Sequence, residues 1–142
     1  MFKRIVAAYD GSDQAIKALN TAIELAKAFN SKLDVVEVVD TAALLGMGFA
    51  PIPSDVIAQI YNKAQNDVEQ AKKKAQEAGV KDVTSQVLEG DPATSIIEYA
   101  SKNGADLIVI GSRGLSTFKR LVLGSVSSKV VQESRIPVLV VK

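Results

Sequence analysis

Residues 5–12, with the sequence IVAAYDGS, decide the fold of this chain. The first five residues form an apolar run without alternation, which is typical of a strand buried on both faces of a parallel sheet. Ser12 can cap a following helix, and apolar residues then recur at helical spacing as far as Asn30. The pattern therefore predicts a buried strand, a tight turn and a helix that packs back on the sheet.

The same pattern repeats along the rest of the chain. Further strands are predicted at residues 33–39, 83–88, 107–110 and 137–141, and further helices near residues 54–79, 91–104 and 125–134. Strands joined through helices run parallel, with right-handed crossovers and helices on both faces. We therefore predict a single α/β domain over residues 1–142, a doubly wound, five-stranded parallel sheet. For this sheet we infer the strand order 3-2-1-4-5, which the pattern alone does not give.

The segment from Asp40 to Pro53 shows no regular period and contains two glycines and two prolines. We interpret it as a long loop. Its apolar residues favour packing over the fold. The alternative is that this segment forms a mobile flap over a ligand or part of a partner surface.

The composition excludes several classes of protein and of chemistry. Hydrophobic residues make up 47 % of the chain and charged residues 23 %, as in globular domains and unlike disordered chains. The absence of cysteine and histidine removes disulfides, thiolate nucleophiles, Ser-His-Asp catalysis and most transition-metal sites. With a net charge of +1, no membrane-length apolar run and no signal sequence, we expect a cytoplasmic protein without a nucleic-acid or membrane partner.

Two segments are suited to ligand binding. Asp10-Gly11-Ser12 follows the first predicted strand, and a glycine-containing segment that begins at Gly111 follows the fourth. In doubly wound sheets, ligands bind beyond the carboxyl ends of the strands, where the strand order reverses. If the first and fourth strands are neighbours at that point, the two segments face one crevice.

The segment after the fourth strand has features of a phosphate site. Gly111, Gly114 and Gly124 let a phosphate approach the backbone closely. Gly124-Ser125 opens a helix, whose free amides and positive dipole end favour an anion. Three cationic side chains occur in the same stretch: Arg113, Lys119 and Arg120. Ordinary turns and a helix cap explain each feature singly, whereas their joint placement favours phosphate binding.

The spacing Gly-x2-Gly-x9-Gly-Ser, from Gly111 to Ser125, resembles the ATP-binding signature of the universal stress protein family. The Asp10-Gly11-Ser12 turn, residues 36–40, residues 89–92 and residues 136–141 also resemble segments of that family. Glu37 stands where family members commonly have histidine. The similarity spans nearly the whole chain and implies ATP as the ligand.

The resemblance also implies which residues contact ATP. The backbone of Val38 would read the adenine edge, and Asp10 would lie near the ribose or the phosphates, with Mg²⁺ (or Mn²⁺) as a bridging ion. Arg113 could pair with a phosphate. The pocket wall and the phosphate cradle would comprise Ala8, Tyr9, Gly111, Gly114, Gly124, Ser125, Val126 and Ser127. From the residues alone, a turn aspartate that caps local amides explains Asp10 equally well, and a buried strand valine explains Val38.

We expect a regulatory or stress-response protein in which bound ATP stabilises one state of residues 112–123, which a protein partner then reads. The alternative is a slow ATP hydrolase or nucleotidyl transferase, with Asp10, Mg²⁺ and Arg113 as its minimal machinery. No general base accompanies these groups, so we expect turnover to be slow or absent. A scaffold with an empty pocket is a third hypothesis, which the intact glycine-serine signature disfavours.

The last predicted strand, from Ile136 to Val141, is apolar and uncharged. Such a strand at a sheet edge favours pairing with a second copy of itself. The resemblance implies the same homodimer, because family members commonly dimerise through this strand. An edge covered by the chain's own loops is the simpler alternative.

Overall fold

Five parallel strands form the central sheet in the computed structural model, which describes residues 1–45, 52–112 and 123–142. The strands are β1 (Arg4–Ala8), β2 (Lys32–Val39), β3 (Val83–Glu89), β4 (Leu107–Gly111) and β5 (Val138–Val141). They lie in the order β3-β2-β1-β4-β5, and every neighbouring pair is parallel. The predicted fold class and strand order are confirmed.

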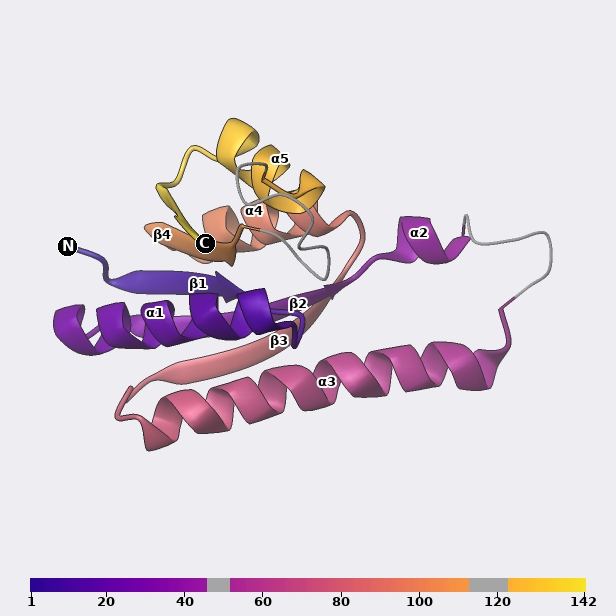
Figure 1. The fold of residues 1–142 in the computed structure, drawn as a ribbon, viewed down its shortest axis with the longest axis horizontal. Helices are drawn as coiled ribbons and strands as arrows, with labels where there is room; N and C mark the ends of the chain where they lie inside the picture. Colours follow the sequence, from indigo (N-terminus) through magenta and orange to yellow (C-terminus); the bar gives the residue numbers. More distant parts are fainter. Residues whose placement is uncertain (46–51, 113–122) are drawn as a thin grey trace.

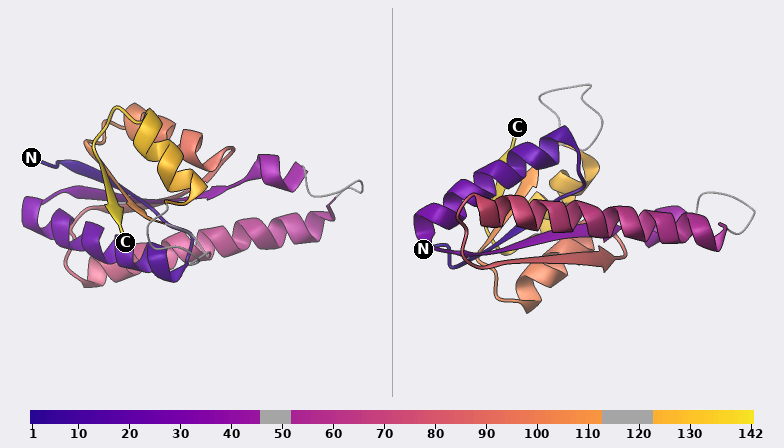
Figure 2. Two further views of the ribbon diagram at one scale, coloured as in Figure 1. Left: turned by 45° about the horizontal axis from the view of Figure 1, so that its top comes forward. Right: turned by 90° about the horizontal axis from the view of Figure 1, so that it is seen from below.

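Helices cover both faces of this sheet (Figures 1 and 2). α1 (Asp13–Phe29) and α3 (Ser54–Glu77) lie on one face, and α4 (Pro92–Lys102) and α5 (Ser125–Glu133) lie on the other. Ile5 and Ala7 of β1 belong to the core under α1 and α3, whereas Val6 and Ala8 belong to the core under α4 and α5. Because successive strand residues face opposite ways and both faces of β1 are covered, residues 5–8 are all apolar.

Side-chain caps fix the start of the helices that follow β1 and β3. The Ser12 hydroxyl oxygen accepts the amide hydrogen of Ala15 at 3.2 Å, and Asn30 ends α1 in the left-handed region with φ 54°. Asp91 accepts the amide hydrogen of Thr94 at 3.0 Å at the start of α4. These bonds satisfy amides that have no partner within their helices. The predicted capping role of Ser12 is therefore confirmed.

α3 is amphipathic along its 24 residues. Ala64, Val68, Ala71 and Ala75 are its buried residues, and the small alanines let the helix approach the sheet closely. The three lysines that follow Ala71 are not part of this core. No helix within the described ranges is long and apolar enough to cross a membrane.

The prediction of a loop from Asp40 to Pro53 is wrong at its start. α2 spans Thr41–Leu45 directly after β2. The Asp40 carboxylate accepts the amide hydrogen of Ala43 at 2.9 Å, and this bond begins the helix. Five residues are too few to show a helical period in the sequence, which is why the pattern missed α2. Residues 46–51 lie outside the described residues, and so does the predicted packing or flap role of that part.

An ion pair between the half-buried Arg4 and the buried Asp34 joins the first three strands on the α4 side. Arg4 Nε lies 2.7 Å from Asp34 Oδ2, and the Thr84 hydroxyl donates to the other oxygen of the same carboxylate. Asp34 is 0 % exposed, and the hydrogen bond to it raises the pKa of Arg4. Because a buried carboxylate is stable only when it is paired, this contact fixes β1 and β3 on either side of β2.

Candidate functional site

The carboxyl ends of β1, β2 and β4 meet at one edge of the sheet, where the strand order reverses. β1 pairs with β4 on one side and with β2 on the other. The prediction that the first and fourth strands are neighbours is thereby confirmed. Asp10 and Gly111, at the ends of these strands, therefore lie at the edge where sheets of this type bind ligands.

α5 begins beside the end of β4. The Gly124 amide donates to the Ser112 carbonyl oxygen at 2.7 Å, and the Ser127 hydroxyl donates to the same oxygen, also at 2.7 Å. The Ser112 amide donates in turn to the Val141 carbonyl oxygen at 2.8 Å. These three bonds fix the first turn of α5 against the ends of β4 and β5.

The first turn of α5 presents backbone amides without acceptors. The Ser128 amide donates to the Gly124 carbonyl oxygen at 2.9 Å, and Gly124 caps the helix without a side-chain bond. The amides of Ser125, Val126 and Ser127 precede that bond and have no acceptor among the described residues. The positive end of the helix dipole coincides with them, so this turn can bind an anion.

Two of the predicted phosphate contacts have other roles in the structure. Ser127 is 2 % exposed, and its hydroxyl contacts the carbonyl oxygens of Ser112 and, at 3.3 Å, Gly124. A Cβ at Gly111 would lie 3.0 Å from the carbonyl oxygen of Gln14 on α1. Glycine at position 111 therefore allows α1 to pack against β4. Ser125, by contrast, is exposed.

β2 extends beyond the end of β1, so the last residues of β2 have no β1 residue opposite them. The Tyr9 amide donates to the Val36 carbonyl oxygen at 2.8 Å, in the last bond between these strands. The Val39 carbonyl oxygen accepts the Gly90 amide on the β3 side, so alternation turns the main chain of Val38 toward β1. Within the described ranges, no main-chain group bonds to Val38 on that side.

Asp10 is exposed at the end of β1, and one of its oxygens acts locally. Oδ1 accepts the Ser12 amide hydrogen at 2.9 Å. Gly11, between them, has φ +80°, a conformation that L side chains rarely adopt. The turn-capping role of Asp10 is confirmed, and its exposed position also suits a ligand contact, which stays a prediction.

Glu37 on β2 and Asp67 on α3 form an acidic cluster beside this turn, which the sequence did not reveal. Glu37 on β2 is 8 % exposed, and its Oε1 has no hydrogen-bond partner among the described residues. Burial first, and then the carboxyl group of Asp67, raise the pKa of Glu37 to about 8. Lys63, 2.7 Å from Asp67, opposes this rise. Glu37 is thus mostly protonated at pH 7.

Asp67 also contacts the turn at the site. A Cβ at Gly11 would lie 3.3 Å from Asp67 Oδ1, so the acidic cluster connects α3 with the turn that follows β1. Tyr9 is half-buried on the same side of the sheet, and burial raises the pKa of its phenol. No sequence signal links Asp67 to Glu37, because only the packing of α3 brings them together.

The structure gathers most of the predicted site residues at one edge. Ala8 and Val126 pack on the α4–α5 side, and Tyr9 packs on the α1–α3 side. Arg113 and Gly114 lie outside the described residues. The predicted residues at the edge are Ala8, Tyr9, Asp10, Val38, Gly111, Gly124, Ser125, Val126 and Ser127.

Fold and site together define a doubly wound α/β protein whose switch point carries helix amides that have no acceptor among the described residues. The chain belongs to the universal stress protein family, whose sequence profile matches residues 1–142. It is 40 % identical over 151 residues to Universal stress protein YxiE of Bacillus subtilis, with 100 % of both chains covered. It is 38 % identical over 142 residues to Universal stress protein MJ0531 of Methanocaldococcus jannaschii, with 100 % of this chain and 83 % of the relative covered.

Solved structures of similar proteins share the fold. The hypothetical protein MJ0577 superposes with a TM-score of 0.82 at 29 % identity, covering 100 % of this chain and 96 % of the other. A universal stress protein in complex with cAMP superposes with a TM-score of 0.72 at 30 % identity, covering 99 % and 96 % of the two chains. The family resemblance is confirmed, and one similar protein binds an adenine nucleotide.

Proposed function

We propose that this protein binds an adenine nucleotide, specifically ATP, at the carboxyl ends of β1, β2 and β4. The observation that carries the proposal is the set of backbone amides at Ser125, Val126 and Ser127, which have no acceptor in the described part of the chain. Phosphate oxygens would accept these hydrogens, and the helix dipole would favour their charge. Bonds from Gly124 and Ser127 to Ser112 hold the amides in place before any ligand arrives.

The main chain of Val38 would bind the adenine. Its N–H and C=O groups lie on the side of β2 that β1 has left. The base has acceptor nitrogens and an amino donor on its edges, so one backbone donor and one backbone acceptor can both bond to it. The similar protein that was solved in complex with cAMP supports a purine ligand for this fold.

Asp10 would hold Mg²⁺ or Mn²⁺ together with the phosphates. The described residues contain no cluster of three acidic side chains that could bind a metal alone. Magnesium commonly takes one or two carboxylates and completes its shell with substrate phosphates and water. The exposed carboxylate of Asp10 therefore fits a metal that arrives with the nucleotide, whose charge the metal would partly neutralise.

We propose that the protein works as a cytoplasmic regulatory homodimer that pairs through the last strand. β5 lies at one edge of the sheet, and Leu139 on it is 36 % exposed. Val131 on α5 is 43 % exposed. Pairing of two such edges would bury apolar side chains and satisfy open main-chain groups. Light scattering tests this directly, because a monomer at micromolar concentration contradicts it.

Thermal unfolding with and without millimolar MgATP tests the proposed site. Ligand at 100 times its Kd stabilises the folded state by about 2.7 kcal/mol, so the Tm should rise by several degrees. Release of inorganic phosphate should stay slower than about one per second. An unchanged Tm at millimolar MgATP contradicts nucleotide binding.

Ser125 offers a matched pair of variants for the same assay. Ser125→Asp places a carboxylate at the first residue of α5. The helix dipole favours this charge, but the charge repels a phosphate. This variant should keep its Tm without nucleotide and lose the MgATP-dependent increase. Ser125→Ala should retain most of that increase, because the backbone amide remains.

A further inference from the structure

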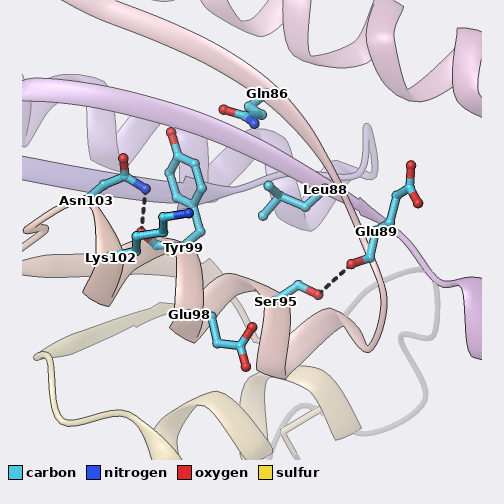
Figure 3. Close-up of a pocket in the computed structure, with 8 residues that line it drawn as sticks. All are labelled: Gln86, Leu88, Glu89, Ser95, Glu98, Tyr99, Lys102 and Asn103. Carbon is cyan, nitrogen blue, oxygen red and sulfur yellow. Dashed lines mark hydrogen bonds between the residues drawn. The ribbon is translucent and has the colours of Figure 1, made fainter.

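A shallow groove of about 370 Å³ lies between β3 and α4 (Figure 3). Gln86 and Leu88 of β3 form one wall. The other wall consists of Ser95, Glu98, Tyr99 and Lys102 of α4 and of Asn103, which caps the helix. Glu89 at the end of β3 also lines the groove. The groove shares no lining residue with the proposed nucleotide site.

The strand that borders the groove is at the edge of the sheet and has open main-chain groups. The Asp82 carbonyl and the Gly90 amide bond to β2 at 2.9 and 3.1 Å, so even-numbered residues of this stretch face β2. The main-chain groups of Ser85 and Val87 therefore point away from the sheet, and they have no main-chain partner within the described ranges.

β3 also lacks the features that usually protect an edge. It pairs with β2 in continuous register from Val83 to Glu89, without a bulge. Its sequence, VTSQVLE, contains neither lysine nor proline. Natural sheets commonly use these devices to prevent strand addition. The edge of β3 is thus competent to pair with another extended chain.

Two charged side chains of α4, Glu98 and Lys102, line the groove one helical turn apart. Glu98 and Lys102 are exposed and one helical turn apart, about 6 Å along the axis. In the part of the chain that the structure describes, neither belongs to an ion pair. Side chains two residues apart on an extended chain share a face and are separated by about 6.6 Å. One basic and one acidic side chain at that spacing match Glu98 and Lys102.

We propose that the edge of β3 binds an extended peptide segment of a partner protein as an added strand, with a basic side chain at Glu98 and an acidic one at Lys102. Main-chain bonds to Ser85 and Val87 supply affinity, as in other cases of strand addition. Leu88 and the Tyr99 ring form the apolar floor of the groove. The charge pair selects the sequence of the segment.

Blocked heptapeptides titrated into the ¹⁵N-labelled full chain test this proposal. The mixed peptide is Thr-Thr-Lys-Thr-Glu-Thr-Thr, and its controls carry two lysines or two glutamates at the charged positions. The mixed peptide should shift the amide signals of Ser85 and Val87 and should bind about three to ten times more tightly than either control. The absence of shifts at millimolar mixed peptide overturns the proposal.

Charge reversal of the groove tests the selectivity. Lys102→Glu makes the groove acidic at both positions, so preference should transfer to the dilysine peptide. Equal affinity of this variant for the mixed and dilysine peptides overturns the assigned charge pairing. MgATP stabilisation should be the same in this variant as in the wild type, which separates the groove from the nucleotide site.

Two further controls test strand addition itself. Ser85→Pro removes an outward amide at an edge position that tolerates proline, and Ser85→Ala loses the same hydroxyl but keeps the amide. The proline variant should bind the mixed peptide more weakly than the alanine variant. Peptides N-methylated either at the central threonine or at both charged residues cover the two strand directions, and one of them should fail to bind. Unchanged binding of both N-methylated peptides overturns the proposal. Loss of a native dimer in the Ser85→Pro variant also overturns it, because the edge of β3 would then be the dimer interface.

Discussion

The Ser127 hydroxyl on α5 donates to the Ser112 carbonyl oxygen at the end of β4, over a distance of 2.7 Å. The Gly124 amide donates to the same oxygen. One carbonyl group thus positions the start of α5, including the amides of Ser125 and Val126. The Ser127 hydroxyl, at a residue that the family resemblance suggested as a phosphate contact, instead holds the neighbouring amides in place.

Ser127→Ala should lower the free energy of unfolding by about 1 kcal/mol, the usual net value of a buried hydrogen bond. Urea denaturation measures this change. Ser125→Ala is the matched control on the same turn, and it should change the stability by less than half as much because Ser125 is exposed. Equal effects of the two substitutions would contradict the role given to Ser127.

Gly111→Ala should destabilise the fold by about 1–3 kcal/mol, the common cost of overpacking. The added methyl would lie 3.0 Å from the Gln14 carbonyl oxygen and 3.2 Å from the carbonyl carbon of the same residue. Relief requires α1 to move away from β4, because backbone atoms cannot rotate aside. Thermal or urea denaturation of the variant tests this, and a wild-type midpoint would exclude the close packing.

Stability should fall as pH rises from about 5 to about 8. The unfolded chain releases the Glu37 proton near pH 4.5, whereas the folded state holds it to about pH 8. The folded state therefore binds more protons in this range, which makes the free energy of unfolding decrease with pH. We expect a loss of at least about 1.4 kcal/mol, equivalent to a tenfold change in the unfolding equilibrium constant.

Glu37→Gln isolates this contribution, because glutamine keeps the shape and has no proton to release. Relative to the wild type, the variant should gain stability as pH rises. Asp67→Asn should move the transition of Glu37 to lower pH, since Asp67 is the neighbouring residue that raises the pKa of Glu37 most. Parallel stability curves for the wild type and Glu37→Gln would show that Glu37 titrates normally.

Arg4→Met should destabilise the protein by about 1–3 kcal/mol, since it leaves the buried Asp34 carboxylate without its cation but with the hydrogen bond from Thr84. The double variant Arg4→Met with Asp34→Leu removes both charges and should recover at least half of that loss. Denaturation of the single and double variants measures the difference. A double variant less stable than Arg4→Met would contradict this account of the pair.

The sequence predicted β1 and β4 because each carries a continuous apolar run between two covered faces, as at residues 5–8. The pattern of β3, VTSQVLE, is less regular, since this strand lies at an edge and is only partly buried. The caps at Ser12 and Asp91 were also predictable, since they depend on neighbouring residues. α2 was missed because five residues show no period. The partnership of Glu37 with Asp67 depends on how α3 crosses the sheet, which no local pattern encodes.

The glycine-serine signature predicted the location of the site better than the role of each residue. Gly111 was interpreted as room for a phosphate, yet its hydrogen atoms make room for Gln14. The open main chain of Val38 follows from β2 being longer than β1, a difference in strand length that side-chain patterns do not report. Geometry thus supplied the roles that spacing alone could not.

An NMR titration of the ¹⁵N-labelled chain with MgATP, compared with adenosine, tests the central claim most directly. The account predicts saturable shifts of the Ser125 and Val126 amides with MgATP and much smaller shifts of these two with adenosine, which has no phosphate. The Val38 amide should shift with both ligands. Unchanged Ser125 and Val126 signals at millimolar MgATP would contradict phosphate binding at the start of α5.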